Sequence, residues 1–92
     1  LDMHEDEKAA EAYDRIITKL NGRGLGIKVY IWLAERYIDE EKLDDALRVL
    51  KHARIKDVDK NWGIEIAYFS ALALRQKGDY EDAIKNYDIV LF

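Results

Sequence analysis

The sequence predicts an all-α fold in which about five helices form a solenoid of antiparallel pairs. The first observation behind this prediction is a repeat, because Ala9, Ala46 and Ala83 are spaced 37 residues apart. Each alanine is followed by a large apolar residue at i+4 and a further apolar residue at i+7, which describes one face of a helix. The residues at i+4 are Tyr13, Leu50 and Tyr87, and those at i+7 are Ile16, Ala53 and Val90.

The same helix face recurring at a fixed period indicates stacked units, each too small to bury that face alone. The second observation is that the chain contains no Pro, so the strongest helix breaker is absent. The chain of 92 residues is short enough to be a single domain. We therefore expect one repeat domain that covers residues 1–92.

The first expected helix covers about 5–20 and the second about 27–39. Gly22, Gly24 and Gly26 lie between them and predict a flexible loop, since glycine enters left-handed C-cap geometry without steric cost. Apolar side chains at helical spacing mark the side of each helix that should be buried. They are Ala9, Ala12, Tyr13, Ile16, Ile17 and Leu20 in the first helix, and Tyr30, Leu33, Ala34 and Tyr37 in the second.

The third helix is expected over about 43–55, the fourth over about 62–77 and the fifth from about residue 80. Gly78 closes the fourth helix and Asp79 caps the fifth. The short connections within pairs make neighbouring helices antiparallel. The apolar stripes are Leu43, Ala46, Leu47, Leu50 and Ala53 in the third, Ala67, Ser70, Ala71 and Leu74 in the fourth, and Ala83, Ile84, Tyr87 and Val90 in the fifth.

Charge, apolar runs and cysteine content indicate which classes of partner the chain is expected to lack. The net charge is -4 with both signs interspersed, so we expect no nucleic-acid partner, because phosphate binding needs a concentrated basic face. No run of about 18 apolar residues occurs, so we expect no membrane insertion. The chain has no Cys, which excludes disulfides and thiolate metal sites and weakly favours a reducing compartment such as the cytoplasm.

The sequence shows no constellation of catalytic, cofactor-binding or metal-ligating residues. The segment 57–61 begins like a calcium loop, but Trp62 stands where that loop needs Gly and Tyr68 where it needs a bidentate Glu. His4 and His52 are far apart, and no Ser or Cys nucleophile signature accompanies either. We therefore expect no enzymatic activity, no cofactor and no metal.

The residues Gly-Asp-Tyr-Glu-Asp-Ala-Ile-Lys-Asn-Tyr at 78–87 resemble the second helix of a tetratricopeptide repeat, and Leu-Ala-Glu-Arg-Tyr at 33–37 resembles the first-helix signature. The repeat of 37 residues is longer than that of the family, which repeats about every 34 residues. In addition, Glu41 occupies the turn position where the family usually has glycine. Sel1-like and half-a-TPR arrays, which stack similar helical hairpins, remain an alternative. The resemblance implies the second helix of a truncated unit at 5–20, a full unit at 27–58 and another, cut at the end, at 64–92.

Tetratricopeptide proteins typically bind a peptide or protein in a concave groove lined by the first helices of the units. The resemblance implies a largely apolar groove with acidic points, lined by Lys28, Ile31, Trp32, Glu35, Ile38, Glu65, Tyr68, Phe69, Leu72 and Arg75. Trp32 and Phe69 are 37 residues apart and suit a hydrophobic anchor surface, since aromatic residues are enriched at hot spots. They suit packing between units as well.

The sequence therefore predicts a non-catalytic module for protein–protein interaction that binds a peptide or protein segment. Its last residues, Ile-Val-Leu-Phe at 89–92, lack the polar cap of a terminal repeat, so we expect a piece of a longer array. The alternative is a structural array that forms homo-oligomers through uncapped end helices. Such contacts would use Ala9, Tyr13, Ile16 and Ile17 in the first helix and Ile84, Tyr87, Val90 and Leu91 in the last.

Overall fold

The computed structural model describes residues 3–92, which form five α-helices and, within that range, no β-strand. The prediction of an all-α fold of about five helices is confirmed. The expected helix limits agree with the structure to within two residues. The helices are α1 (Met3–Leu20), α2 (Ile27–Asp39), α3 (Leu43–Lys56), α4 (Gly63–Lys77) and α5 (Tyr80–Leu91).

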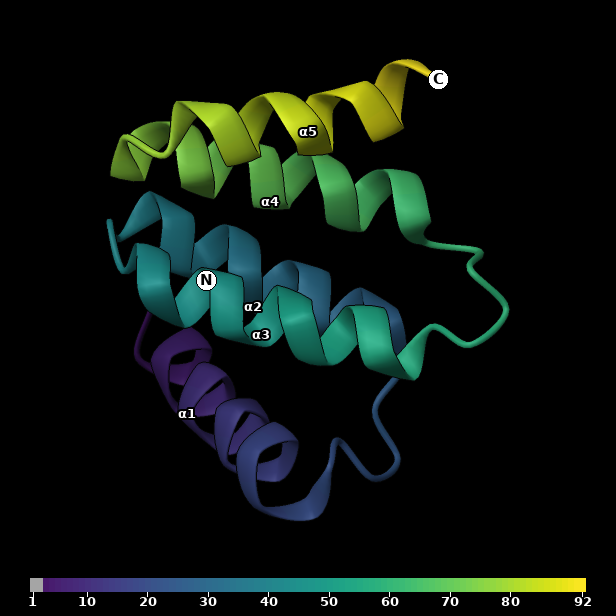
Figure 1. The fold of residues 1–92 in the computed structure, drawn as a ribbon. Coiled ribbons are helices and arrows are strands. Elements are labelled where there is room, and N and C mark those ends of the chain that lie inside the picture. Colours follow the sequence, from purple (N-terminus) through teal and green to yellow (C-terminus); the bar gives the residue numbers. More distant parts are fainter. Residues whose placement is uncertain (1–2) are drawn as a thin grey trace.

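Helices α2 to α5 lie side by side and alternate in direction, so that α2–α3 and α4–α5 form two hairpins (Figure 1). Helices α3 and α4 make most of the contact between the two hairpins, and α2 also contacts α4. The connections within the hairpins, at 40–42 and 78–79, are too short for any other direction of the second helix.

The turns of the two hairpins have the same backbone geometry. Glu41 (φ 60°) and Gly78 (φ 97°) both occupy the left-handed region. The Lys42 N–H donates to the carbonyl of Tyr37, and the Asp79 N–H donates to that of Leu74, both at 2.8 Å. These are the 6→1 bonds of a Schellman motif, and their residues are again 37 apart. Asp79 precedes α5 as predicted, but its side chain makes no capping hydrogen bond.

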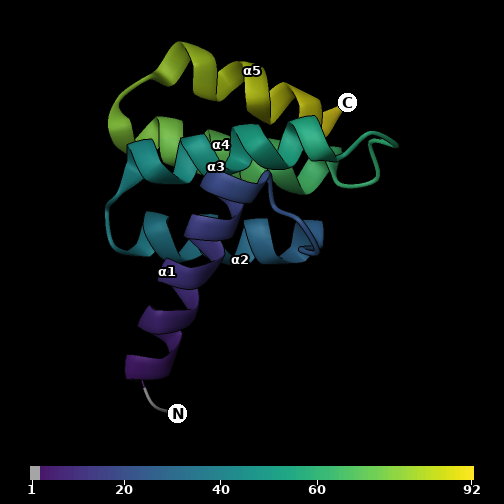
Figure 2. The same cartoon turned by 90° about the horizontal axis from the view of Figure 1, so that it is seen from below.

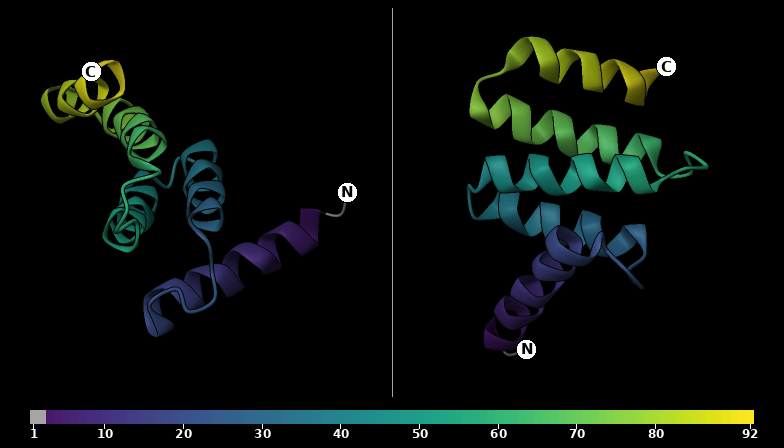
Figure 3. Two further views of the ribbon diagram at one scale, coloured as in Figure 1. Left: turned by 90° about the vertical axis from the view of Figure 1, so that its right-hand side faces the viewer. Right: turned by 60° about the horizontal axis from the view of Figure 1, so that its bottom comes forward.

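Helix α1 does not continue the row. It crosses α2 and α3 steeply (Figures 2 and 3) and contacts only these two helices among those described. Ala10 and Ile17 are buried, whereas Ala9 and Ile16 are only half-buried. The repeat positions Ala9 and Ile16 are therefore displaced by one residue from the buried face, because a crossing helix meets its neighbours along a different line from a stacked one. Ile17 is buried as expected. Ala12 and Leu20, which were expected on the packing side, are exposed.

The core consists of two clusters. The larger cluster contains residues of α1, α2, α3 and α4. The smaller cluster consists of Ile38, Ala46 and Ala73, which belong to α2, α3 and α4. Helix α5 packs mainly against α4, and Arg54 of α3 also donates a hydrogen bond to Asn86 Oδ1 at 3.2 Å. The buried residue of α5 is Ala83, whereas Ile84, which was expected on the packing side, is exposed. The larger cluster contains Ala10, Ile17, Tyr30, Leu33, Ala34, Val49, Leu50, Ala53 and Ile66.

The loop between α1 and α2, which was expected to be flexible, packs closely at Gly22. Gly22 is buried with φ 70°, and its carbonyl accepts a hydrogen bond from Lys56 Nζ at 2.6 Å. A Cβ atom at this position would collide with the hydroxyl of Tyr30, which is itself a fully buried side chain. Glycine is therefore required here by its backbone angle and by close packing.

Candidate functional site

The residues predicted to line a groove belong to α2 and α4, which contact each other directly. Trp32 on α2 is 37% exposed and Tyr68 on α4 is 43% exposed. These two rings are the large apolar groups that this surface offers to a partner. The exposed charged residues are Lys28, Glu35, Glu65 and Arg75, and the half-buried apolar residues are Ile31, Phe69 and Leu72.

Ile38 does not belong to this surface. Its side chain is only 6% exposed and packs with Ala46 and Ala73 in the smaller core cluster. Its prediction as a groove residue is corrected, because the position on α2 that should face the groove lies against α3 and α4 instead. Phe69 and Leu72 also pack against this cluster, and Phe69 meets the ring of Tyr68 edge-on at 5.3 Å between centroids. Phe69 therefore packs between the core cluster and the exposed ring of Tyr68.

The ring of Trp32 is held by two neighbours. Tyr13 of α1 meets it edge-to-face, with centroids 5.9 Å apart and an angle of 87° between the planes. The guanidinium of Arg36 lies 6.0 Å from its centroid, at the limit of a cation–π contact. An aromatic pair of this kind contributes about 0.5–1.5 kcal/mol beyond burial. Trp32 and Phe69 thus differ in their packing. Trp32 packs against Tyr13 of α1, outside the two core clusters, whereas Phe69 packs against both clusters.

A hollow of about 390 Å³ lies next to Trp32, between α1 and the start of α2. Tyr13 and Val29 complete its apolar wall, and sequence reasoning missed both as neighbours of the predicted surface. The repeat places Tyr13 on the packing side of its helix but does not indicate that it meets Trp32, because this contact depends on the crossing of α1. The hollow is lined by Asp6, Ala9, Tyr13, Lys28, Val29 and Trp32.

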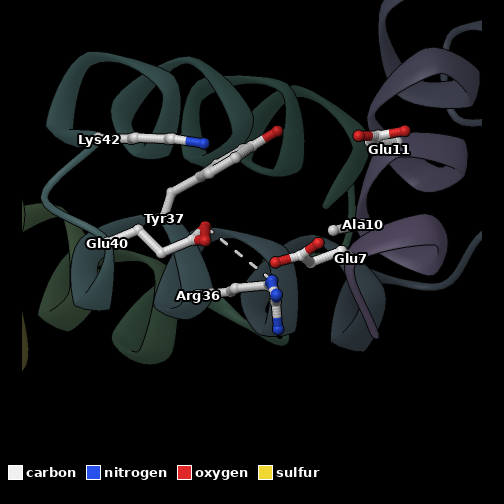
Figure 4. Close-up of a pocket in the computed structure, with 7 residues that line it drawn as sticks. All are labelled: Glu7, Ala10, Glu11, Arg36, Tyr37, Glu40 and Lys42. Carbon is white, nitrogen blue, oxygen red and sulfur yellow. Dashed lines mark ion pairs between the residues drawn. The ribbon is translucent and has the colours of Figure 1, made fainter. Parts of the chain in front are cut away.

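A second hollow, of about 290 Å³, lies where α1 passes the end of α2 (Figure 4). Arg36 and Glu40 form an ion pair at 3.9 Å on one side, and Glu7 points toward Arg36 from α1 (Figure 4). Both signs of charge meet in this hollow, so it has no strong preference for an ion of either sign. Its lining consists of Glu7, Ala10, Glu11, Arg36, Tyr37, Glu40 and Lys42.

A polar cluster joins α1 to α2 and α3 near this hollow. The carboxylate of Asp14 accepts two hydrogen bonds from Arg48, at 3.0 Å from Nη1 and 2.8 Å from Nη2. It also accepts hydrogen bonds from the hydroxyls of Tyr37 and Thr18, and Arg48 contacts Asp45 at 3.2 Å. A bidentate pair of this kind fixes orientation as well as distance. The cluster therefore sets how α1 lies on the hairpin.

The protonation states in the cluster favour its hydrogen bonds. Burial opposes ionisation of Asp14, but the hydrogen bonds from Arg48, Tyr37 and Thr18 outweigh it and lower the pKa of the carboxyl. Burial, followed by the hydrogen bond to Asp14, raises the pKa of the Tyr37 hydroxyl. The hydrogen bond to Asp14 raises the pKa of Arg48 against the effect of burial. At neutral pH the carboxylate is thus ionised and both donors keep their protons.

Among the described residues, no group of three or more His, Asp or Glu is placed to hold a metal ion. No helix in the same part of the chain is long and apolar enough to cross a membrane. Comparison of the chain with protein-family models, curated proteins and solved structures finds no match.

Proposed function

We propose that the chain is a non-catalytic protein–protein interaction module of the tetratricopeptide type, which binds a peptide segment across α2 and α4. The observation that carries this proposal is the pair of exposed rings, Trp32 and Tyr68, on two helices in contact. Each ring is braced by an aromatic neighbour, Tyr13 or Phe69. Braced, partly exposed aromatic residues lose little freedom on binding and are typical anchors of an interface.

The repeat of the hairpins supports the family assignment in the proposal. The turn bonds from Lys42 to Tyr37 and from Asp79 to Leu74 have the same length, and the buried alanines Ala46 and Ala83 follow them at equal distance along the chain. In the proposed stack, two hairpins built alike present α2 and α4 on the same side. A partner can then contact equivalent residues of both units at once.

Each residue on this surface has a distinct role in the proposal. Trp32 and Tyr68 take apolar side chains of the partner. The half-buried Ile31, next to Trp32 in sequence, and Leu72, one turn after Tyr68, add apolar area to this surface. Their burial by a partner is favourable in proportion to the apolar area removed from water. The charged residues orient the segment rather than hold it, because exposed ion pairs contribute little to affinity. They are Lys28, Glu35, Glu65 and Arg75.

Selection of peptides from a phage-displayed library on the purified chain tests the proposal. Peptides that bind the wild type should lose roughly tenfold or more in affinity for Trp32→Ala and Tyr68→Ala, since a lost aromatic contact costs about 1.5–3 kcal/mol. Tyr80→Ala is the matched control, because Tyr80 is an exposed tyrosine on α5. The proposal is wrong if selected peptides bind folded Trp32→Ala and Tyr68→Ala as tightly as the wild type.

The alternative function, a self-assembling array, is favoured by one observation on α5. Tyr80, Ile84 and Leu91 are all exposed and lie on one side of the helix at i, i+4 and i+11. A second copy that covered this side would bury three large apolar groups. Sedimentation velocity over a range of concentrations tests it, with Ile84→Glu as the variant. A monomer at every concentration counts against assembly, and a dimer that Ile84→Glu dissociates supports it.

A further inference from the structure

The charges of the chain are segregated in sequence. The segments 15–34 and 46–56 contain eight of the 15 Lys and Arg residues and none of the 19 Asp and Glu residues. The mixing of both signs seen along the rest of the chain therefore does not extend to these two segments, although the net charge is -4. The eight cations are Arg15, Lys19, Arg23, Lys28, Arg48, Lys51, Arg54 and Lys56.

The fold brings these two segments together. The loop between α1 and α2 passes the end of α3 (Figure 1), where Lys56 Nζ donates to the carbonyl of Gly22 at 2.6 Å. The same ammonium lies 5.6 Å from the centre of the Tyr30 ring. Lys51 lies one turn before Ile55 on the same side of α3, and Arg23 follows Gly22 directly. Lys56 thus lies at this place, with Arg23 adjacent in the loop and Lys51 one turn away on α3.

An apolar hollow lies at this place. Its volume is about 210 Å³, and it is lined by Asn21, Tyr30, His52, Ile55 and Lys56. Ile55 is 69% exposed and forms an apolar edge, whereas Tyr30 is buried. A cavity of about 150 Å³ is enough to hold a benzene ring, so the hollow has room for one apolar side chain. It shares no residue with the surface on α2 and α4.

We propose that this basic-apolar patch, made of Arg23, Lys51, His52, Ile55 and Lys56, binds an acidic peptide segment that carries one apolar side chain. The apolar side chain occupies the hollow beside Ile55. The flanking carboxylates lie against Lys51 and Arg23, where complementary charge raises the rate of association and fixes the register. The patch is thus a second docking surface, separate from the peptide surface proposed above.

The geometry favours a peptide over the other anionic partners. Single-stranded nucleic acid binds by stacking bases on exposed aromatic faces, but the Tyr30 ring is buried and covered by Lys56. An anionic membrane takes up several apolar groups that protrude together from one face, whereas this patch exposes one, Ile55, and its other apolar residue, Tyr30, is buried. An acidic peptide matches both features of the patch, because one apolar side chain can enter the hollow and the neighbouring carboxylates can pair with Lys51 and Arg23.

Fluorescence anisotropy with a fluorescein-labelled peptide, a single phenylalanine flanked by glutamates, tests the proposal on the whole chain. At low salt this peptide should bind about tenfold or more tightly than the same peptide with alanine in place of phenylalanine. Lys51→Glu should weaken binding about tenfold, and Ile55→Ala should remove most of the preference for phenylalanine. Binding should weaken at about 0.15 M salt, where the Debye length falls to about 8 Å.

Lys85→Glu is the control, because it makes the same change in charge at an exposed lysine on α5 and should leave binding unchanged. Melting followed by circular dichroism checks that each variant is folded. The proposal is overturned if the two peptides bind alike, if Lys85→Glu weakens binding as much as Lys51→Glu, or if no peptide binds. It is also overturned if a single-stranded DNA or vesicles containing phosphatidylserine bind more tightly than the phenylalanine peptide.

Discussion

Helices α1 and α5 stand at the two ends of the molecule and are attached in different ways. Helix α5 lies along α4 and buries Ala83. Ala83 occupies the same position of the repeat as the buried Ala46 on α3. Helix α1 crosses the α2–α3 hairpin and is oriented by Asp14, which accepts hydrogen bonds from Tyr37 and Arg48. One end is thus positioned by small apolar residues and the other largely by a polar cluster.

The repeat shows why the two ends differ. The residues equivalent to Asp14 are Lys51 on α3 and Asp88 on α5, and both are exposed. Only on α1 does this position face inward, because Arg48 and Tyr37 offer a partner for its carboxylate. Turning Asp14 inward also turns Ala10 and Ile17 inward in place of Ala9 and Ile16. A polar cluster can therefore change the face of a helix that its apolar pattern alone would select.

The largest expected effect comes from the loop that joins α1 to the hairpin. Gly22→Ala should destabilise the fold by about 2–4 kcal/mol, since it adds a left-handed non-glycine residue and a collision with Tyr30. Gly24→Ala is the control, because Gly24 also has a positive φ but has no atom within 4 Å of an added Cβ. It should cost about 1–2 kcal/mol. Denaturant unfolding of the two variants measures the difference, and equal losses would mean that Tyr30 moves aside.

Leucine substitutions test the packing faces of the two end helices. Ala83→Leu should cost about 1–3 kcal/mol because Ala83 is buried between α5 and α4. Ala9→Leu should change stability by less than about 0.5 kcal/mol, since Ala9 is half-buried beside an open hollow. Thermal melts at equal concentration compare them. A greater loss for Ala9→Leu would show that α1 packs in the register of the repeat after all.

Removal of the Asp14 charge tests the polar attachment of α1. Asp14→Asn should cost about 1–2 kcal/mol, since it weakens hydrogen bonds to a cation at a partly exposed site. Hydrogen exchange should become faster in α1 and stay unchanged in α5, which does not contact the cluster. Glu11→Gln, at an exposed residue of the same helix, is the matched control. Equal exchange in α1 of both variants would show that apolar contacts alone hold this helix.

The same cluster predicts a dependence on pH. The pKa of Asp14 is lowered in the folded chain, so its contribution is fully present above the ordinary value of about 3.9. The contribution is lost as the pH falls through the lowered value, because the unfolded state then binds the proton more readily. Asp14→Asn should unfold in acid without this step. Unfolding free energies of wild type and variant should therefore converge as the pH falls below about 4, and a constant difference would exclude the linkage.

The sequence was sufficient for the helices and for most of the core, because apolar spacing and glycine positions act locally. It was insufficient for α1, where the orientation depends on Asp14 meeting Arg48 and Tyr37 from other helices. The same limit applies to the candidate site. Trp32 and Tyr68 were expected on this surface from the resemblance to tetratricopeptide repeats, whereas the contact of Tyr13 with Trp32 depends on the crossing of α1. Ile38 was misplaced because one position along a helix decides between a surface and a core.

The smallest expected effect concerns the turns that lead into α3 and α5. The left-handed backbone conformation costs about 1–2 kcal/mol at Glu41, whereas Gly78 adopts it without steric strain. Glu41→Gly removes this strain but adds freedom to the unfolded chain, worth about 0.4–1 kcal/mol, so a net gain of about 0.5–1 kcal/mol is expected. Gly78→Ala should lower stability, although no atom lies within 4 Å of its added Cβ. Each 1 kcal/mol corresponds to a shift of about 4–8 °C in Tm. If Glu41→Gly lowers Tm, the exposed Glu41 side chain contributes more than its backbone costs, and the two turns are not equivalent.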